Sequence, residues 1–193
     1  MIRKTYEKRI LEIFSDNLFS IHSTDNERKY DVVYSEDCSR QDESYSPKYG
    51  IILKDTDENT LKTAIIIGSA SGATTPHENS VIVDSGNIIV AIGGSVICLE
   101  LETLKSKWKI KTENSYACFA VYRFLNHFVA HCEGSIISFK ENGEINWEFT
   151  GRDIFVTPDG VDDFNIEGDK VVVKDWDGNT YKLTFEGHEE KLL

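Results

Sequence analysis

The residues best suited to chemistry lie together in a short segment at positions 75–80. His77, Glu78 and Asn79 place an imidazole, a carboxylate and an amide side by side. An imidazole next to a carboxylate can transfer protons near neutral pH, and an amide can hold a polar ligand through hydrogen bonds. The same side chains can instead satisfy the backbone groups of a turn. The sequence therefore leaves open a catalytic or small-ligand loop at these three residues and a purely local turn.

A second candidate is the acidic stretch of residues 151–163. It contains Asp153, Asp159, Asp162 and Asp163. Carboxylates this close together could bind Ca²⁺ or contact lysine and arginine side chains of another protein. Their spacing lacks the alternating oxygen ligands and the central glycine of a twelve-residue calcium loop. We therefore expect these four residues either to contact a protein partner or to form a solvated loop.

Other chemistry finds less support in the sequence. His127, His131 and Cys132 form a His/Cys group, but on a strand the two histidines share one face and the cysteine takes the other. The chain contains no G-x-S-x-G nucleophile motif and no phosphate-binding P-loop. We expect no catalytic residue, no metal site and no cofactor, and hence a protein that is not an enzyme.

The charge of the chain indicates which partners it can take. The formal net charge is −12, and residues 141–193 carry −9 of it, with fourteen acidic against five basic residues. Such a surface repels nucleic acid and anionic membranes, which bind clustered lysine and arginine, and it speeds encounter with a basic protein. The alternative is that the acidity only keeps the protein soluble.

The cysteines and the start of the chain bear on its location. Cys38, Cys98, Cys118 and Cys132 have no C-x-x-C spacing, and three of them lie in apolar runs. We expect reduced, buried thiols, with a disulfide or metal ligation as alternatives. The basic N-terminus lacks the apolar stretch of a signal peptide, and the chain has no apolar run long enough for a membrane span. A cytoplasmic location follows.

A repeat decides the predicted architecture. Gly94, Gly134 and Gly178 are 40 and 44 residues apart, and Trp108 and Trp147 are 39 apart. Around each glycine hairpin the pattern predicts four short strands, which is typical of a propeller blade. We expect one domain at 1–193: an irregular part at 1–79 and repeat units at 80–112, 113–150 and 151–193. The predicted fold is all-β, a propeller-like array of four-stranded antiparallel meanders.

The first 79 residues are harder to interpret. The spacing of Ile2, Tyr6 and Ile10 is loosely helical and predicts a short N-terminal helix. Residues 30–34, 49–53 and 61–67 have strand composition and would form a degenerate fourth sheet, with a polar loop at 36–47. Between the sheets we expect six buried aromatic side chains: Trp108, Trp147, Phe149, Trp176, Tyr181 and Phe185.

One stretch resembles a known family. Residues 89–103, IVAIGGSVICLELET, followed by Trp108, are similar to the repeat of quinoprotein-like (PQQ-like) β-propellers. That repeat also has a strand, a glycine turn, an apolar strand, a short turn and a strand bearing tryptophan. The match covers parts of residues 80–193 and implies blade structure. It implies no quinone cofactor, because full quinoprotein propellers have more blades than this chain can hold.

The sequence favours a non-catalytic module that binds another protein, and a basic one. A small, acidic protein without catalytic motifs is typical of immunity proteins that neutralise a cationic toxin, although no matched residues support that comparison. The alternatives are a ligand-binding protein or enzyme that uses the loop at His77, Glu78 and Asn79, and a structural subunit. The sequence does not identify the partner or the oligomeric state.

Overall fold

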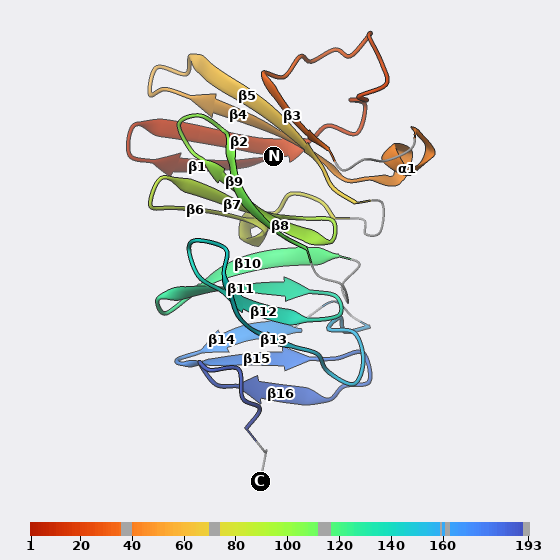
Figure 1. The fold of residues 1–193 in the computed structure, drawn as a ribbon, viewed down its shortest axis with the longest axis vertical. Helices are drawn as coiled ribbons and strands as arrows, with labels where there is room; N and C mark the ends of the chain where they lie inside the picture. Colours follow the sequence, from red (N-terminus) through yellow and green to blue (C-terminus); the bar gives the residue numbers. More distant parts are fainter. Residues whose placement is uncertain (36–39, 70–73, 112–116, 159, 161–162, 191–193) are drawn as a thin grey trace.

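The computed structural model describes residues 1–35, 40–69, 74–111, 117–158, 160 and 163–190. Its strands form four sheets that are stacked one on the next in chain order, with the N-terminus in the first sheet and the last strand in the fourth (Figure 1). The predicted all-β, propeller-like array is confirmed. Across the described residues, neither helix is long or apolar enough to cross a membrane.

Sheet A contains the N-terminal strands and has the order β1-β2-β4-β5-β3. Its pairs are antiparallel except for β3, which runs parallel to β5. The strands are β1 (Ile2–Tyr6), β2 (Arg9–Ser15), β3 (Val32–Ser35), β4 (Lys48–Lys54) and β5 (Thr60–Ile67).

The other three sheets are antiparallel meanders in simple sequence order. Sheet B contains β6 (Val81–Asp84), β7 (Asn87–Ile92), β8 (Ser95–Glu100) and β9 (Ser106–Lys111). Sheet C contains β10 (Cys118–Phe124), β11 (His127–Cys132), β12 (Ile136–Phe139) and β13 (Ile145–Phe149). Sheet D contains β14 (Phe164–Glu167), β15 (Lys170–Lys174) and β16 (Thr180–Leu183), and a bridge from Leu183 to Glu189 begins a further pairing.

The predicted N-terminal helix is wrong. Residues 2–15 form the hairpin β1–β2, with Glu7 at a positive φ of 51° in the turn. The strand β2 lies between β1 and β4 and buries side chains on both of its faces. Its apolar residues therefore do not alternate with polar ones, and their spacing resembled that of a helix. The other three N-terminal strands were predicted correctly, and they pair with this hairpin to complete sheet A.

Apolar side chains fill the space between successive sheets. One cluster joins sheets A and B, a second joins B and C, and a third joins C and D. The described residues contain no comparable cluster between sheets D and A, so the array they form is open.

A repeated aromatic contact fixes each sheet to the next. Trp108 in the last strand of sheet B donates its indole N–H to the carbonyl of Glu141 in sheet C, at 2.9 Å. Trp147 in sheet C makes the equivalent bond to Phe185 at the edge of sheet D, also at 2.9 Å. Tyr34 in sheet A plays the same part, because its hydroxyl donates to the carbonyl of Leu104 in sheet B at 2.8 Å.

The turns that receive the two indoles require glycine. Each is a five-residue turn, at 140–144 and at 184–188. In both turns the N–H of the first residue donates to the carbonyl of the fifth residue, and the fourth residue has a positive φ. That fourth residue is Gly143 (φ 83°) beneath Trp108 and Gly187 (φ 82°) beneath Trp147. A Cβ at these positions would lie 2.7 Å and 2.5 Å from the respective indole rings. Glycine is therefore needed for both the backbone conformation and the ring contact.

The far face of sheet A is covered by the protein's own chain. We call residues 16–31 and helix α1 (Arg40–Tyr45) the cap. Phe19 and Tyr30 of the cap pack together, with ring centres 5.3 Å apart, in a small cluster with Ile65 and Ile67. The sequence predicted a polar loop at 36–47, but residues 40–45 of it form α1, and residues 36–39 lie outside the described residues. The cap thus covers part of sheet A on the side away from sheet B.

The expected reduced thiols are corrected for one pair. Cys118 and Cys132 form a disulfide, because they lie directly opposite each other on β10 and β11. The cytoplasmic location stays a prediction. Cys98 is free and buried, and burial raises the pKa of its thiol to about 11, so it remains protonated and unreactive. Cys38 lies outside the described residues.

Candidate functional site

The loop at His77, Glu78 and Asn79 lies where three sheets meet. Glu78 and Asn79 belong to the short 3₁₀ helix η1 (Glu78–Ser80), which leads into β6. His77 Nε2 is 2.9 Å from the carbonyl oxygen of Phe119 in sheet C, and Glu78 accepts a bond from Lys4 Nζ of sheet A at 2.7 Å. Each of these side chains has an intramolecular partner, which is the arrangement expected of a structural brace.

The third residue of the loop connects it to the second candidate site. Asn79 and Asp163 both act on the hydroxyl of Tyr122 in β10. Burial and the negative charge of Asp163 together raise the pKa of Tyr122, and the Asn79 side chain opposes this shift. The structure therefore brings one residue from each predicted site to Tyr122.

Asp163 also acts on a buried histidine. The His131 ring is 4% exposed, stacks on Phe164 with ring centres 5.1 Å apart, and places Nε2 at 2.8 Å from the carbonyl oxygen of Phe155. Burial lowers the pKa of His131, while the Asp163 carboxylate and the Phe155 carbonyl oppose this shift. A histidine held neutral and bonded in this way supports the chain segment around Phe155.

The predicted His/Cys group does not converge on a metal site. The His127 ring stacks on Phe185 with ring centres 4.6 Å apart, His131 is bonded to Phe155, and Cys132 is in the disulfide. Within the part of the chain that the structure describes, no group of three or more His, Cys, Asp or Glu residues could hold a metal ion.

The acidic stretch is anchored to the scaffold by its backbone. The Phe155 N–H donates to the carbonyl of Glu133 at 2.6 Å, and the Trp176 N–H donates to the carbonyl of Ile154 at 2.8 Å. Asp153 accepts a bond from the following N–H through its own carboxylate, at 2.7 Å. Asp159 and Asp162, the other two predicted contacts in this stretch, lie outside the described residues.

Trp176 departs from its predicted place in the core. Its side chain is 49% exposed, in the turn between β15 and β16, and Asp177 next to it is exposed as well. Its backbone bond to Ile154 joins this turn to the acidic stretch. We call Asp153, Asp163, Trp176 and Asp177 the acidic platform. The sequence signal for the exposed position of Trp176 was its place between Asp175 and Asp177 in a hairpin turn.

A buried carboxylate holds the platform from below. Asp175 is fully buried and accepts bonds from the Asn179 N–H at 2.8 Å and from the Tyr181 hydroxyl at 2.7 Å. Burial raises the pKa of Asp175, but the hydrogen bonds from Asn179 and Tyr181 outweigh it and leave the pKa below its usual value. Tyr181 in turn accepts the N–H of Arg152 at 3.0 Å. The platform therefore rests on a fully bonded polar network.

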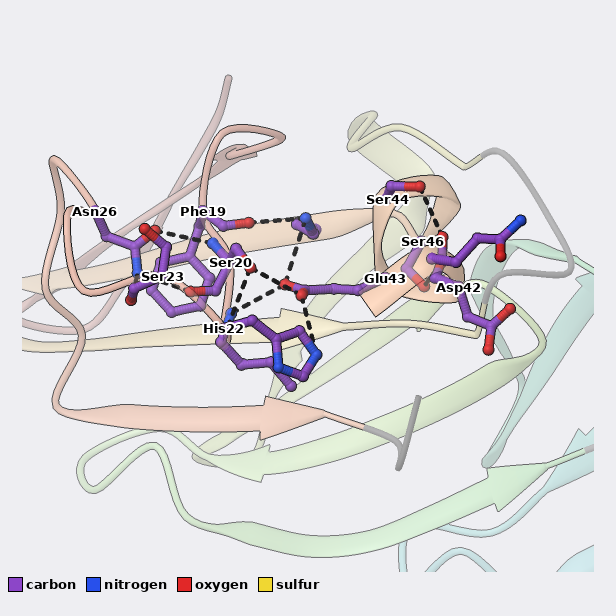
Figure 2. Close-up of polar contacts among 12 residues, drawn as sticks. Phe19, Ser20, His22, Ser23, Asn26, Asp42, Glu43, Ser44 and Ser46 are labelled. Carbon is purple, nitrogen blue, oxygen red and sulfur yellow. Dashed lines mark hydrogen bonds and ion pairs between the residues drawn. The ribbon is translucent and has the colours of Figure 1, made fainter. Parts of the chain in front are cut away.

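The sequence analysis missed a second buried polar cluster, in the cap. Figure 2 shows Glu43 reaching from α1 toward Ser20 and His22. Its carboxylate accepts the Ser20 hydroxyl at 2.9 Å and the Ile21 N–H at 3.0 Å, and it lies 3.5 Å from Lys48 Nζ. Burial raises the pKa of Glu43, but these bonds and the charges of Lys48 and His22 bring it below its usual value. The sequence signal was a lysine at the start of an otherwise apolar strand.

This cluster does not have the geometry of a catalytic triad. The Ser20 hydroxyl donates to the Glu43 carboxylate and accepts a hydrogen bond from the backbone N–H of His22 at 3.1 Å. The His22 ring instead places Nε2 at 3.6 Å from the same carboxylate (Figure 2). The serine is therefore not hydrogen-bonded to a ring nitrogen that could remove its proton. The cluster ties the two parts of the cap, residues 16–31 and α1, to each other and to β4.

Comparison with known proteins identifies the fold. No protein-family model matches the chain, and a search of curated proteins gives no significant match. Among solved structures, BamB from Moraxella catarrhalis is similar with a TM-score of 0.51 and 15% identity, over 82% of this chain and 49% of BamB. Dihydro-heme d1 dehydrogenase NirN is similar with a TM-score of 0.50 and 10% identity, over 77% of this chain and 34% of NirN.

These likenesses show a propeller-like fold and do not extend to activity. The chain spans about half the length of BamB and about a third of NirN.

Proposed function

We propose that this protein is a non-catalytic binding module whose acidic platform contacts a basic partner protein. The observation that carries this proposal is the half-exposed Trp176 side chain, which its backbone bond to Ile154 holds beside the acidic stretch and which is followed by the exposed carboxylate of Asp177. Tryptophan is enriched among the residues that contribute most to protein–protein binding, and its ring can also receive a lysine or arginine cation.

The rigidity of the platform supports the same proposal. Asp175, Tyr181 and the backbone bonds of Phe155 and Trp176 fix the platform before any partner arrives. Binding to a preformed surface avoids the entropic cost of ordering loops. The net charge of −9 on residues 141–193 would accelerate association with a cationic partner.

The bonding of the other candidate residues favours binding over catalysis. His77, Glu78 and His131 are engaged by neighbouring sheets, as a brace requires. We further propose that the blade repeat belongs to the quinoprotein-like type and serves here as a scaffold without the quinone.

A charge reversal with an internal control tests the proposal. The turn at residues 54–60, KDTDENT, repeats the pattern of residues 174–180, KDWDGNT. Asp57 and Asp177 therefore occupy the same exposed turn position, in sheet A and on the platform. The wild-type chain would first be used to capture its partner from native lysate. The association and dissociation rates of this partner would then be measured at low salt on the immobilised wild type, Asp177→Lys, Trp176→Ala and Asp57→Lys.

We expect Asp177→Lys to slow association severalfold and Trp176→Ala to speed dissociation at least tenfold, whereas Asp57→Lys should match the wild type. If Asp57→Lys and Asp177→Lys change the rates equally, the platform is not the binding surface. If turnover of a small molecule is found and Trp176→Ala leaves it intact, the module is an enzyme instead.

A further inference from the structure

The cap contains a hollow that the acidic platform does not use. It has a volume of about 260 Å³, and its lining includes Leu18, Phe19 and Arg40 together with the buried pair Glu43 and Lys48. It lies at the sheet A end of the stack, and the platform lies at the sheet D end (Figure 1). The two surfaces can therefore be tested independently.

Large apolar side chains are exposed around this hollow. Leu18 is 84% exposed and Tyr45 is 71% exposed. Leu18 lines the hollow directly, Tyr45 follows the lining residue Ser44, and Ile21, also exposed, donates its N–H to Glu43. An exposed apolar side chain that lines a preformed hollow, such as Leu18, marks an interaction surface.

The described residues that line the hollow carry a net charge of the opposite sign to that of the protein. Glu43 is neutralised by Lys48 at 3.5 Å, and Lys48 also donates to the carbonyl of Phe19 at 2.7 Å. Arg40 is exposed and makes no hydrogen bond or ion pair with any residue that the structure describes. Among the lining residues that the structure describes, positive charges therefore exceed negative ones by one, in a chain of net charge −12. A guanidinium in this position is suited to a carboxylate, which it can bind through two parallel hydrogen bonds.

The buried cluster keeps the hollow in shape. Glu43 of α1 is 2% exposed and is bonded to Ser20 and Ile21 in the other part of the cap (Figure 2). Its ion-pair partner Lys48 begins the central strand β4. The walls of the hollow are thus fixed from both sides. Its volume lies just below the range of cofactor and drug sites, and suits a single side chain with its flanking backbone.

We propose that this hollow binds a short acidic peptide segment of a partner protein, which places a carboxylate on Arg40 and an aliphatic side chain against Leu18 and Phe19. This surface recognises the opposite charge to the one that the platform recognises. A single partner with separate basic and acidic segments could engage both ends of the stack.

Synthetic peptides test this directly with the full chain. The probe is a short acetylated peptide of alternating leucine and aspartate, and its control replaces each aspartate with asparagine. Affinity would be measured by calorimetry on the wild type, Arg40→Gln, Leu18→Ser and Arg152→Gln. Arg152 is an exposed arginine near the platform and serves as the matched control. Thermal melting would verify that each variant is folded.

We expect the aspartate peptide to bind with a Kd below 1 mM and the asparagine peptide at least tenfold more weakly. Arg40→Gln should lower the affinity for the aspartate peptide at least tenfold, and Leu18→Ser should lower it severalfold. Arg152→Gln should leave this affinity unchanged. Equal binding of the two peptides, or an unchanged affinity in Arg40→Gln, would overturn the proposal. So would a concentration-dependent dimer that Arg40→Gln dissociates without any peptide binding, because the occupant would then be a second copy of the chain.

Discussion

The contact between an indole and a turn glycine makes a quantitative prediction about how the sheets are joined. In Gly187→Ala the new Cβ would lie 2.5 Å from the Trp147 ring, and the residue would also have to keep a φ of about 82°. Gly178 is the matched control: it occupies the same position of the same five-residue turn, at φ 84°, with nothing within 4 Å of an added Cβ.

The two substitutions separate backbone strain from the ring contact. Gly178→Ala should cost about 1 kcal/mol, the usual penalty of a left-handed backbone for an L-residue. Gly187→Ala carries the same penalty, together with about 2 kcal/mol for displacing the indole and weakening its 2.9 Å bond to Phe185. The expected total is about 3 kcal/mol of unfolding free energy.

Urea unfolding followed by circular dichroism measures both variants, and a double-mutant cycle tests the cause. In a Trp147→Ala background, Gly187→Ala should cost only about 1 kcal/mol, because the ring that it meets is gone. Equal penalties for Gly187→Ala and Gly178→Ala would refute the reasoning. An undiminished penalty in the Trp147→Ala background would do so as well.

Two further predictions concern buried charge. Burial lowers the pKa of His131 from its usual 6.5, so the unfolded chain takes up a proton below about pH 6.5 that the folded protein resists. The stability that this resistance contributes is complete above that pH and is lost as the pH falls. In His131→Phe the urea midpoint should therefore decline less between pH 7 and 5 than in the wild type. An equal decline in the two proteins would contradict this prediction. Glu43→Gln should lower the free energy of unfolding by about 3 kcal/mol, because Lys48 is left as a buried charge without its ion-pair partner. In the double variant Glu43→Gln with Lys48→Met, part of this loss should be recovered in the same urea assay. Additive losses would show that the two side chains do not stabilise each other.

Strand alternation and the glycine spacing were enough to predict sheets B, C and D. Trp108 and Trp147 were predicted to be buried between sheets, and each packs partly buried against a core cluster there. Local pattern failed at β2, where burial on both faces removes the alternation that identifies a strand. It also failed at Trp176, whose predicted burial ignored that a residue in a hairpin turn has no sheet to cover it.

The sequence by itself determined the blade repeat and the acidity of the C-terminal part, because these depend on period and composition. Only the tertiary structure decided which groups meet. Asn79 and Asp163 converge on Tyr122, Cys118 pairs with Cys132, and Glu43 is buried against Lys48. Pairings between distant segments depend on how the sheets stack and on strand register, and neither is encoded in the local period of the residues that meet.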